Sequence, residues 1–199
     1  MIAFASVFED VMGVHRLNHA VLYVRDVATT TQFYGEVLDF RIVNQFPGAV
    51  FLQAPDSTND HDLGLFQVGA AAAPSDAGRA TVGLYHIAWE VDTLGELQRL
   101  AGLLRERGAL VGASDHGTTK SLYAMDPDGL EFEVVWIIPA TLLTADDIAA
   151  RSTVRALDLP AEIERFGRDE PGGIGISLPD ETGQTPGHIS DHENGDAPT

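Results

Sequence analysis

Two segments decide the fold: Leu-Asn-His-Ala-Val-Leu-Tyr-Val at residues 17–24 and Leu-Tyr-His-Ile-Ala-Trp-Glu-Val at residues 84–91. They are two copies of one pattern, 67 residues apart, and each begins Leu-x-His and ends in Val. The alternation of β-prone residues along each copy is typical of a strand. It places His19 and His86 at matching positions in the two strands. The chain therefore contains an internal repeat in which each copy opens with a histidine-bearing strand.

A helix and three short strands are predicted after each copy. The apolar spacing predicts helices over residues 27–38 and 93–108, and Gly108 ends the second of them. Each half is therefore βαβββ, and this order predicts an α+β fold of two βαβββ modules rather than a doubly wound sheet. The predicted strands span residues 39–45, 49–54 and 61–68 in the first half and 109–113, 120–126 and 130–138 in the second, with the turn Asp126-Pro127-Asp128-Gly129 before the last.

The repeat sets the expected domain boundaries. We expect an N-terminal extension, two modules joined by a linker, and an acidic C-terminal segment. Within that segment, residues 144–167 predict one helix with Thr144 as its N-cap. From residue 169 onward the chain is rich in Gly, Pro and acidic residues, which predicts a mobile tail. The boundaries are 1–13 for the extension, 14–70 for the first module, 71–82 for the linker, 83–140 for the second module and 141–199 for the C-terminal segment.

Composition excludes several classes of function. The chain has 199 residues, with 12 Lys and Arg against 30 Asp and Glu, and its formal net charge is −18. Such a charge repels phosphate backbones and anionic lipid, so we expect no nucleic-acid and no membrane partner. Cysteine is absent, so a metal would have to be held by His, Asp or Glu. The first residues carry Glu9 and Asp10 where a signal peptide needs a basic start, so we expect a cytoplasmic protein.

Three residues are candidate metal ligands. A single histidine in an apolar strand is usually a hydrogen-bonded core residue, but His19 and His86 occupy equivalent repeat positions that a pseudo-twofold axis would bring together. Glu133 lies within an otherwise apolar strand, where a carboxylate is costly unless it is paired or bound to metal. Glu131 falls on the same face, and alternation alone does not choose between the two. Two histidines and a carboxylate form the facial triad of non-haem Fe(II) oxygenases.

A second group of polar residues could take part in chemistry. His61 opens a predicted strand after a polar loop, and His116 lies in the loop Ser-Asp-His-Gly-Thr-Thr at residues 114–119. Both would otherwise be solvent-facing imidazoles. Tyr123 would otherwise be a half-buried strand aromatic.

The modules and their residues resemble the vicinal oxygen chelate superfamily, which includes glyoxalases, bleomycin-resistance proteins and extradiol dioxygenases. The segment from Asp115-His116-Gly117 through Leu122-Tyr123 and Asp126-Pro127-Asp128-Gly129 to Glu133 is similar to the extradiol ring-cleavage signature. Ser114, two residues before the histidine, departs from that signature. The resemblance covers residues 14–138.

This resemblance implies a role for each candidate. It implies that His19, His86 and Glu133 bind Fe(II), with Mn(II) as the alternative metal, and it favours Glu133 over Glu131. It further implies that His61 is an acid–base residue beside the dioxygen site. His116 and Tyr123 would be a pair that hydrogen-bonds the substrate. The implied activity is extradiol cleavage of a catechol-like aromatic by dioxygen, in a homodimer.

Two other functions remain open. A glyoxalase-type lyase or isomerase uses a fourth ligand, a Glu from the last strand of the first module. Here that strand, residues 61–68, offers no Glu at an inner position, which argues against this reading. A non-catalytic binding or resistance protein of the same fold would have no need for three converging ligands.

Overall fold

The computed structural model describes residues 13–14, 16–78 and 80–173. Nearly all of the predicted N-terminal extension, and the predicted tail from residue 174 onward, lie outside the described residues. None of the described helices is long and apolar enough to cross a membrane.

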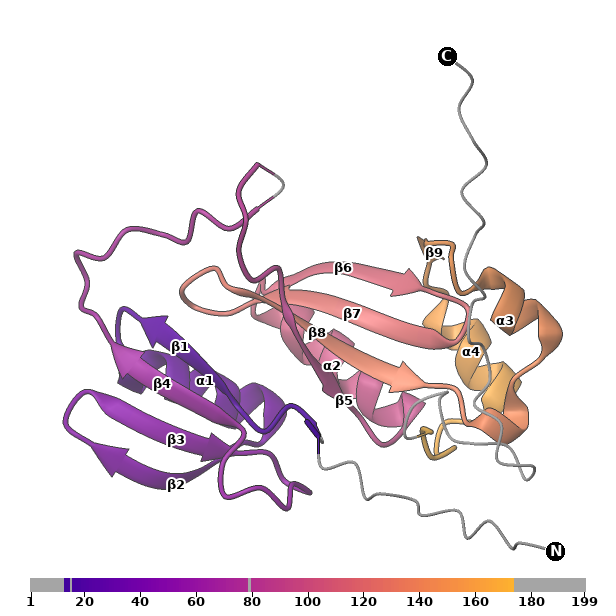
Figure 1. Ribbon diagram of the computed structural model, residues 1–199. Coiled ribbons are helices and arrows are strands. Elements are labelled where there is room, and N and C mark those ends of the chain that lie inside the picture. Colours follow the sequence, from indigo (N-terminus) through magenta and orange to yellow (C-terminus); the bar gives the residue numbers. More distant parts are fainter. Residues whose placement is uncertain (1–12, 15, 79, 174–199) are drawn as a thin grey trace, which may run out of the picture.

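The first module is a four-stranded sheet backed by one helix (Figure 1). The strand order is β1-β4-β3-β2, in which β1 and β4 are parallel and the other pairs are antiparallel. Within this sheet β1 pairs only with β4, so β1 is an edge strand. Its elements are β1 (Ala20–Val24), α1 (Val27–Leu38), β2 (Arg41–Phe46), β3 (Ala49–Gln53) and β4 (Leu63–Gln67).

The second module repeats this topology. The strand order is β5-β8-β7-β6-β9, in which β5 and β8 are parallel, and α2 lies behind the sheet (Figure 1). The predicted α+β fold of two βαβββ modules is confirmed. Its elements are β5 (Ile87–Glu90), α2 (Leu94–Glu106), β6 (Leu110–Asp115), β7 (Thr119–Met125) and β8 (Glu131–Ile137).

The C-terminal segment differs from its prediction. Instead of one helix over residues 144–167, the structure has α3 (Ala145–Ala150), the short strand β9 (Arg155–Ala156) and α4 (Leu159–Phe166), after a 3₁₀ turn at Ala140–Leu142. Pro160 lacks the N–H that a helix interior needs, so it sits in the first turn of a new helix capped by Asp158. Because β9 pairs with β6, the segment extends the second sheet.

Aromatic and apolar contacts join the two modules. Phe33 of α1 packs edge-on against Phe132 of β8, with ring centroids 6.0 Å apart. The ring centroids of Phe40 and of Trp89 in β5 lie 5.0 Å apart. At the end of β1, Arg25 Nη1 forms an ion pair of 2.9 Å with Asp128 in the turn before β8. These contacts tie the first module to the strand pair β5 and β8.

Candidate metal centre

The parallel pairing of β5 and β8 places His86 beside two carboxylates. The register pairs Ile87 with Phe132 and Ala88 with Glu133, so His86 falls opposite Glu131 one step earlier. His86 Nε2 lies 3.1 Å from Glu133 Oε2, and His86 Nδ1 lies 3.6 Å from Glu131 Oε1. The imidazole is therefore flanked by Glu133 on one nitrogen and Glu131 on the other.

Tyr123 and His116 adjoin this pair. Tyr123 of β7 is the register partner of Glu133, and its hydroxyl donates to Glu133 Oε1 over a long 3.5 Å. His116 Nε2 lies 2.9 Å from the same hydroxyl oxygen. With the hydroxyl proton directed at Glu133, an Nε2–H on His116 fills the donor role toward Tyr123. Burial and then the negative charge of Glu133 raise the pKa of Tyr123 to about 12, so the phenol stays protonated.

A buried ion network holds the loop that carries His116. Lys120 of β7, only 1% exposed, donates to Asp115 Oδ1 at 2.6 Å. The backbone N–H of Gly117 donates to the same oxygen at 2.8 Å. Burial raises the pKa of Asp115, but the hydrogen bonds from Lys120 and Gly117 outweigh it and hold that pKa below its usual value. The loop is thus fixed on both sides of His116.

Close packing against α3 fixes the same loop. Gly117 has φ +77°, in the left-handed region, and a Cβ on it would clash with the carbonyl oxygen of Asp147. Arg155 of β9, in the C-terminal segment, forms an ion pair with Asp115, with 2.8 Å between Nη2 and Oδ2. The C-terminal segment, to which the sequence assigned no role in the site, therefore supports the position of His116.

The turn before β8 contains a carboxyl group with an altered pKa. Asp126 Oδ1 accepts hydrogen bonds from the backbone N–H groups of Asp128 and Leu130, at 2.8 and 2.9 Å. Burial raises the pKa of Asp126 to about 6, although these hydrogen bonds oppose the shift. The turn fixes the start of β8 and so the positions of Glu131 and Glu133.

His19 and His61 form a separate pair in the first module. Their ring centroids are 4.5 Å apart, and Phe51 packs edge-on against His61 at 4.9 Å. His61 Nδ1 lies 2.8 Å from Asp60 Oδ2. His19 is exposed immediately before β1, with Nδ1 2.7 Å from Asn18 Oδ1. The structure thus brings these two predicted residues together, apart from the other four.

The donor set fits two positions of a metal site. Two ligand atoms each about 2.1 Å from an ion and about 90° apart lie about 3 Å from each other, which matches the 3.1 Å between His86 Nε2 and Glu133 Oε2. Across residues 13–14, 16–78 and 80–173, no three His, Asp or Glu side chains gather closely enough to hold an ion. The structure does not bring His19 to the pair, and its role as third ligand stays a prediction.

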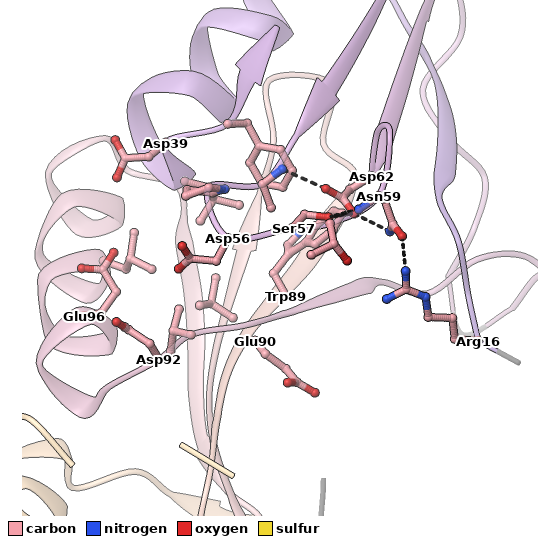
Figure 2. Close-up of a pocket in the computed structure, with 18 residues that line it drawn as sticks. Arg16, Asp39, Asp56, Ser57, Asn59, Asp62, Trp89, Glu90, Asp92 and Glu96 are labelled. Carbon is pink, nitrogen blue, oxygen red and sulfur yellow. Dashed lines mark hydrogen bonds between the residues drawn. The ribbon is translucent and has the colours of Figure 1, made fainter. Parts of the chain in front are cut away.

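Two cavities border the second module. One of about 630 Å³, shown in Figure 2, lies between the loop after β3, the end of α1, β5 and the start of α2. Its wall is strongly acidic, with Asp39, Asp56, Asp92 and Glu96 on one side of the view, and none of the six predicted residues lines it. The other, about 840 Å³, is lined by the linker, by the start of β8 and by Glu131. Of these two cavities, the second is bordered by Glu131, one of the two carboxylates that flank His86.

Sequence reasoning missed the contact between Glu131 and His86, and the buried Lys120. Alternation had placed Glu131 and Glu133 on one face, which was the available signal. No pattern indicated that His86, just before β5, would be aligned with both carboxylates, because that alignment depends on the register between two strands that are distant in sequence.

Comparison with known proteins identifies the family of this chain. The sequence profile of the "Glyoxalase/Bleomycin resistance protein/Dioxygenase superfamily" matches residues 16–134. Over 115 residues the chain is 36% identical to Biphenyl-2,3-diol 1,2-dioxygenase 3 of Rhodococcus globerulus, an alignment that covers 57% of this chain and 59% of that protein. Over 189 residues it is 27% identical to Catechol-2,3-dioxygenase of Bacillus subtilis (strain 168), covering 94% of this chain and 62% of that protein. The chain therefore spans less than two thirds of the length of these curated relatives.

A solved structure agrees on the fold. The crystal structure of a glyoxylase/bleomycin resistance protein/dioxygenase domain from Frankia sp. EAN1pec superposes with a TM-score of 0.51. It is 19% identical and covers 62% of this chain and 92% of its own, a likeness that concerns the fold alone. The profile match spans more than half of the chain and both modules, and the protein therefore belongs to the Glyoxalase/Bleomycin resistance protein/Dioxygenase superfamily.

Proposed function

We propose that the protein is an Fe(II)-dependent extradiol dioxygenase that opens the ring of a catechol-like aromatic, with Mn(II) as the alternative metal. The observation that carries the proposal is the cluster of His86, Glu133, Tyr123 and His116 in the second module. Glu133 and Tyr123 lie on the paired strands β8 and β7, His86 lies just before β5, and His116 lies in the loop before β7. The similarity to a biphenyl-diol and a catechol dioxygenase supports it.

His86 and Glu133 would hold the metal, with His19 as the predicted third ligand. When bound, Fe(II) supplies open positions and electrons for the joint activation of a diol and dioxygen. One histidine and one carboxylate give the site borderline and hard donors suited to a divalent first-row ion. Glu133, whose side chain is 13% exposed, is a largely shielded carboxylate whose charge such an ion would neutralise.

Tyr123 and His116 would orient the substrate. The raised pKa of Tyr123 keeps its hydroxyl a hydrogen-bond donor at neutral pH. A donor held in place beside the metal ligand Glu133 can bind a phenolate oxygen of the diol, and His116 holds that donor at 2.9 Å.

His61 is the candidate to move a proton. An imidazole can both accept and donate a proton, and Asp60 orients the ring through Nδ1. The ring of His61 contacts that of His19, so a proton held by His61 would lie beside the predicted third ligand.

The cavity of about 840 Å³ bordered by Glu131 gives room for the ring. Its volume falls in the range of small-molecule sites, roughly 300–1,000 Å³. Val82 and Leu84 supply apolar wall beside Glu131. A neutral, planar catechol suits this lining better than an anion, because the chain carries a formal net charge of −18.

Oxygen uptake tests the proposal. Protein loaded anaerobically with Fe(II) is mixed with aerated buffer and a panel of mono- and bicyclic catechols. We expect one O₂ consumed per catechol, with a yellow ring-opened product. Bound metal without uptake on any catechol would favour the lyase or isomerase alternative, and absence of bound metal would favour a binding protein. The predicted homodimer stays a prediction.

A further inference from the structure

Two buried atoms beside the proposed metal centre lack hydrogen-bond partners. His86 Nδ1 and Glu131 Oε1 are both shielded from solvent without a hydrogen bond to any described residue. They face each other at 3.6 Å. A buried polar atom left unpaired costs about 1–3 kcal/mol, so a pair of such atoms pointing at each other requires an explanation.

The strand register makes this arrangement specific. Glu131 and Glu133 lie on one face of β8, and Phe132 between them pairs with Ile87. His86, just before Ile87, is thus held between two carboxylates on a neighbouring strand. The Glu131 side chain is only 16% exposed, which disfavours a free carboxylate there.

A neutral imidazole carries one N–H, so one of its nitrogens donates a hydrogen bond and the other offers a lone pair. An N–H at Nδ1 directed at Glu131 leaves the Nε2 lone pair free, and that nitrogen faces Glu133 Oε2 at 3.1 Å. The reverse tautomer would place a proton where a metal ion must bind. Carboxylates that accept from the outer nitrogen of a ligand histidine commonly fix its tautomer and raise its basicity.

We propose that Glu131 is a positioning residue that accepts a hydrogen bond from His86 Nδ1–H and thereby presents Nε2 to the metal. The proposal rests on the proposed function, because it assigns the metal to the Nε2 side. For this hydrogen bond to form, the distance between His86 Nδ1 and Glu131 Oε1 has to shorten from 3.6 Å to about 3 Å, a movement of a few tenths of an ångström. Glu131 acts through His86 and is not itself a ligand, since its nearest oxygen lies on the opposite nitrogen from Glu133.

Metal affinity is the first test. Mn²⁺ is titrated into metal-free full-length chain and followed by electron paramagnetic resonance. Glu131→Ala is expected to weaken Mn²⁺ binding 10- to 100-fold while the stoichiometry at saturation stays that of the wild type. Glu131→Gln keeps a side-chain oxygen that accepts from Nδ1–H, so its affinity is expected to recover to within a few-fold. Glu106→Ala, an exposed carboxylate at the end of α2, controls for lost charge.

The tautomer of His86 is the second test and needs no metal. In metal-free Glu133→Ala, Glu131 is the remaining carboxylate beside the ring, and ¹⁵N NMR is expected to show the Nδ1–H tautomer. In the double variant Glu131→Ala/Glu133→Ala that preference is expected to disappear. Unchanged Mn²⁺ affinity in Glu131→Ala, or the same tautomer in both metal-free variants, would overturn the proposal. If the wild type binds no Mn²⁺, the proposed function is wrong, while the NMR comparison still decides the contact.

Discussion

His116 Nε2 and Tyr123 Oη lie 2.9 Å apart, although one belongs to a loop and the other to the middle of β7. The ion pair of Asp115, one residue before His116, with Lys120, three residues before Tyr123, holds the loop against the strand. The contact between His116 and Tyr123 gives the tyrosine hydroxyl a fixed position next to Glu133.

Tyr123→Phe should lower turnover about 100-fold, because it removes one fixed donor without changing the ring's packing. Metal binding should be unaffected, since the variant leaves His86 and Glu133 in place. Steady-state kinetics on Fe(II)-loaded protein, with iron content measured on the same samples, check this. Iron loss in step with turnover would show that the hydroxyl serves the metal site instead of the substrate.

His61→Ala should retain iron and lose turnover, because His61 is assigned to proton movement and not to metal binding. Its ring packs between His19 and Phe51, so the variant's thermal unfolding should be recorded to exclude a folding defect. Wild-type turnover in a folded His61→Ala protein would contradict the acid–base role.

Asp126→Asn should alter the pH dependence of stability. The pKa of Asp126 in the folded protein, about 6, lies above the value of 3.8 expected when it is unfolded. Its contribution is therefore fully present below about pH 4 and is lost as pH rises through about 6. Asparagine keeps the oxygen that accepts from Asp128 and Leu130, and it cannot ionise.

The free energy of unfolding of the wild type, relative to Asp126→Asn, should thus fall by up to about 3 kcal/mol between pH 4 and pH 7. Urea unfolding of both proteins at several pH values measures it. Parallel curves across this range would mean that Asp126 titrates normally.

Two glycines with nearly the same φ give a matched comparison. Gly129, at φ +80°, has open space where a Cβ would lie, whereas at Gly117, at φ +77°, a Cβ would strike the backbone of α3. Gly129→Ala should cost about 1–2 kcal/mol from the left-handed backbone alone. Gly117→Ala should cost about 3 kcal/mol or more, since overpacking adds to the same strain. Equal losses in urea unfolding would mean that α3 does not hold the His116 loop.

The fold could be predicted from sequence where local signals agree. The helix predicted over residues 27–38 matches α1, because Asp26 caps its start through the N–H of Thr29 and Asp39 ends it in the left-handed conformation. The prediction of one continuous helix over residues 144–167 was wrong. It relied on the N-cap and acidic first turn at residue 144 and gave too little weight to Pro160. Because proline lacks a backbone N–H, Pro160 is accommodated in the first turn of a separate helix, α4.

The candidate site was predictable in part for a similar reason. The resemblance to the extradiol signature implied roles for Glu133, Tyr123 and His116 together, and the structure places them on neighbouring strands of one hairpin and in the loop before it. The position of His19 relative to His86 depends on how the two modules pack, which no local pattern specifies.

Anaerobic Fe(II) titration tests the central claim most directly, namely that His86 and Glu133 hold a metal. We predict one tightly bound equivalent in the wild type and none in His86→Ala or Glu133→Ala, with folding of each variant confirmed by circular dichroism. A full equivalent retained at wild-type affinity in either folded variant would contradict the assignment of the metal centre to β5 and β8.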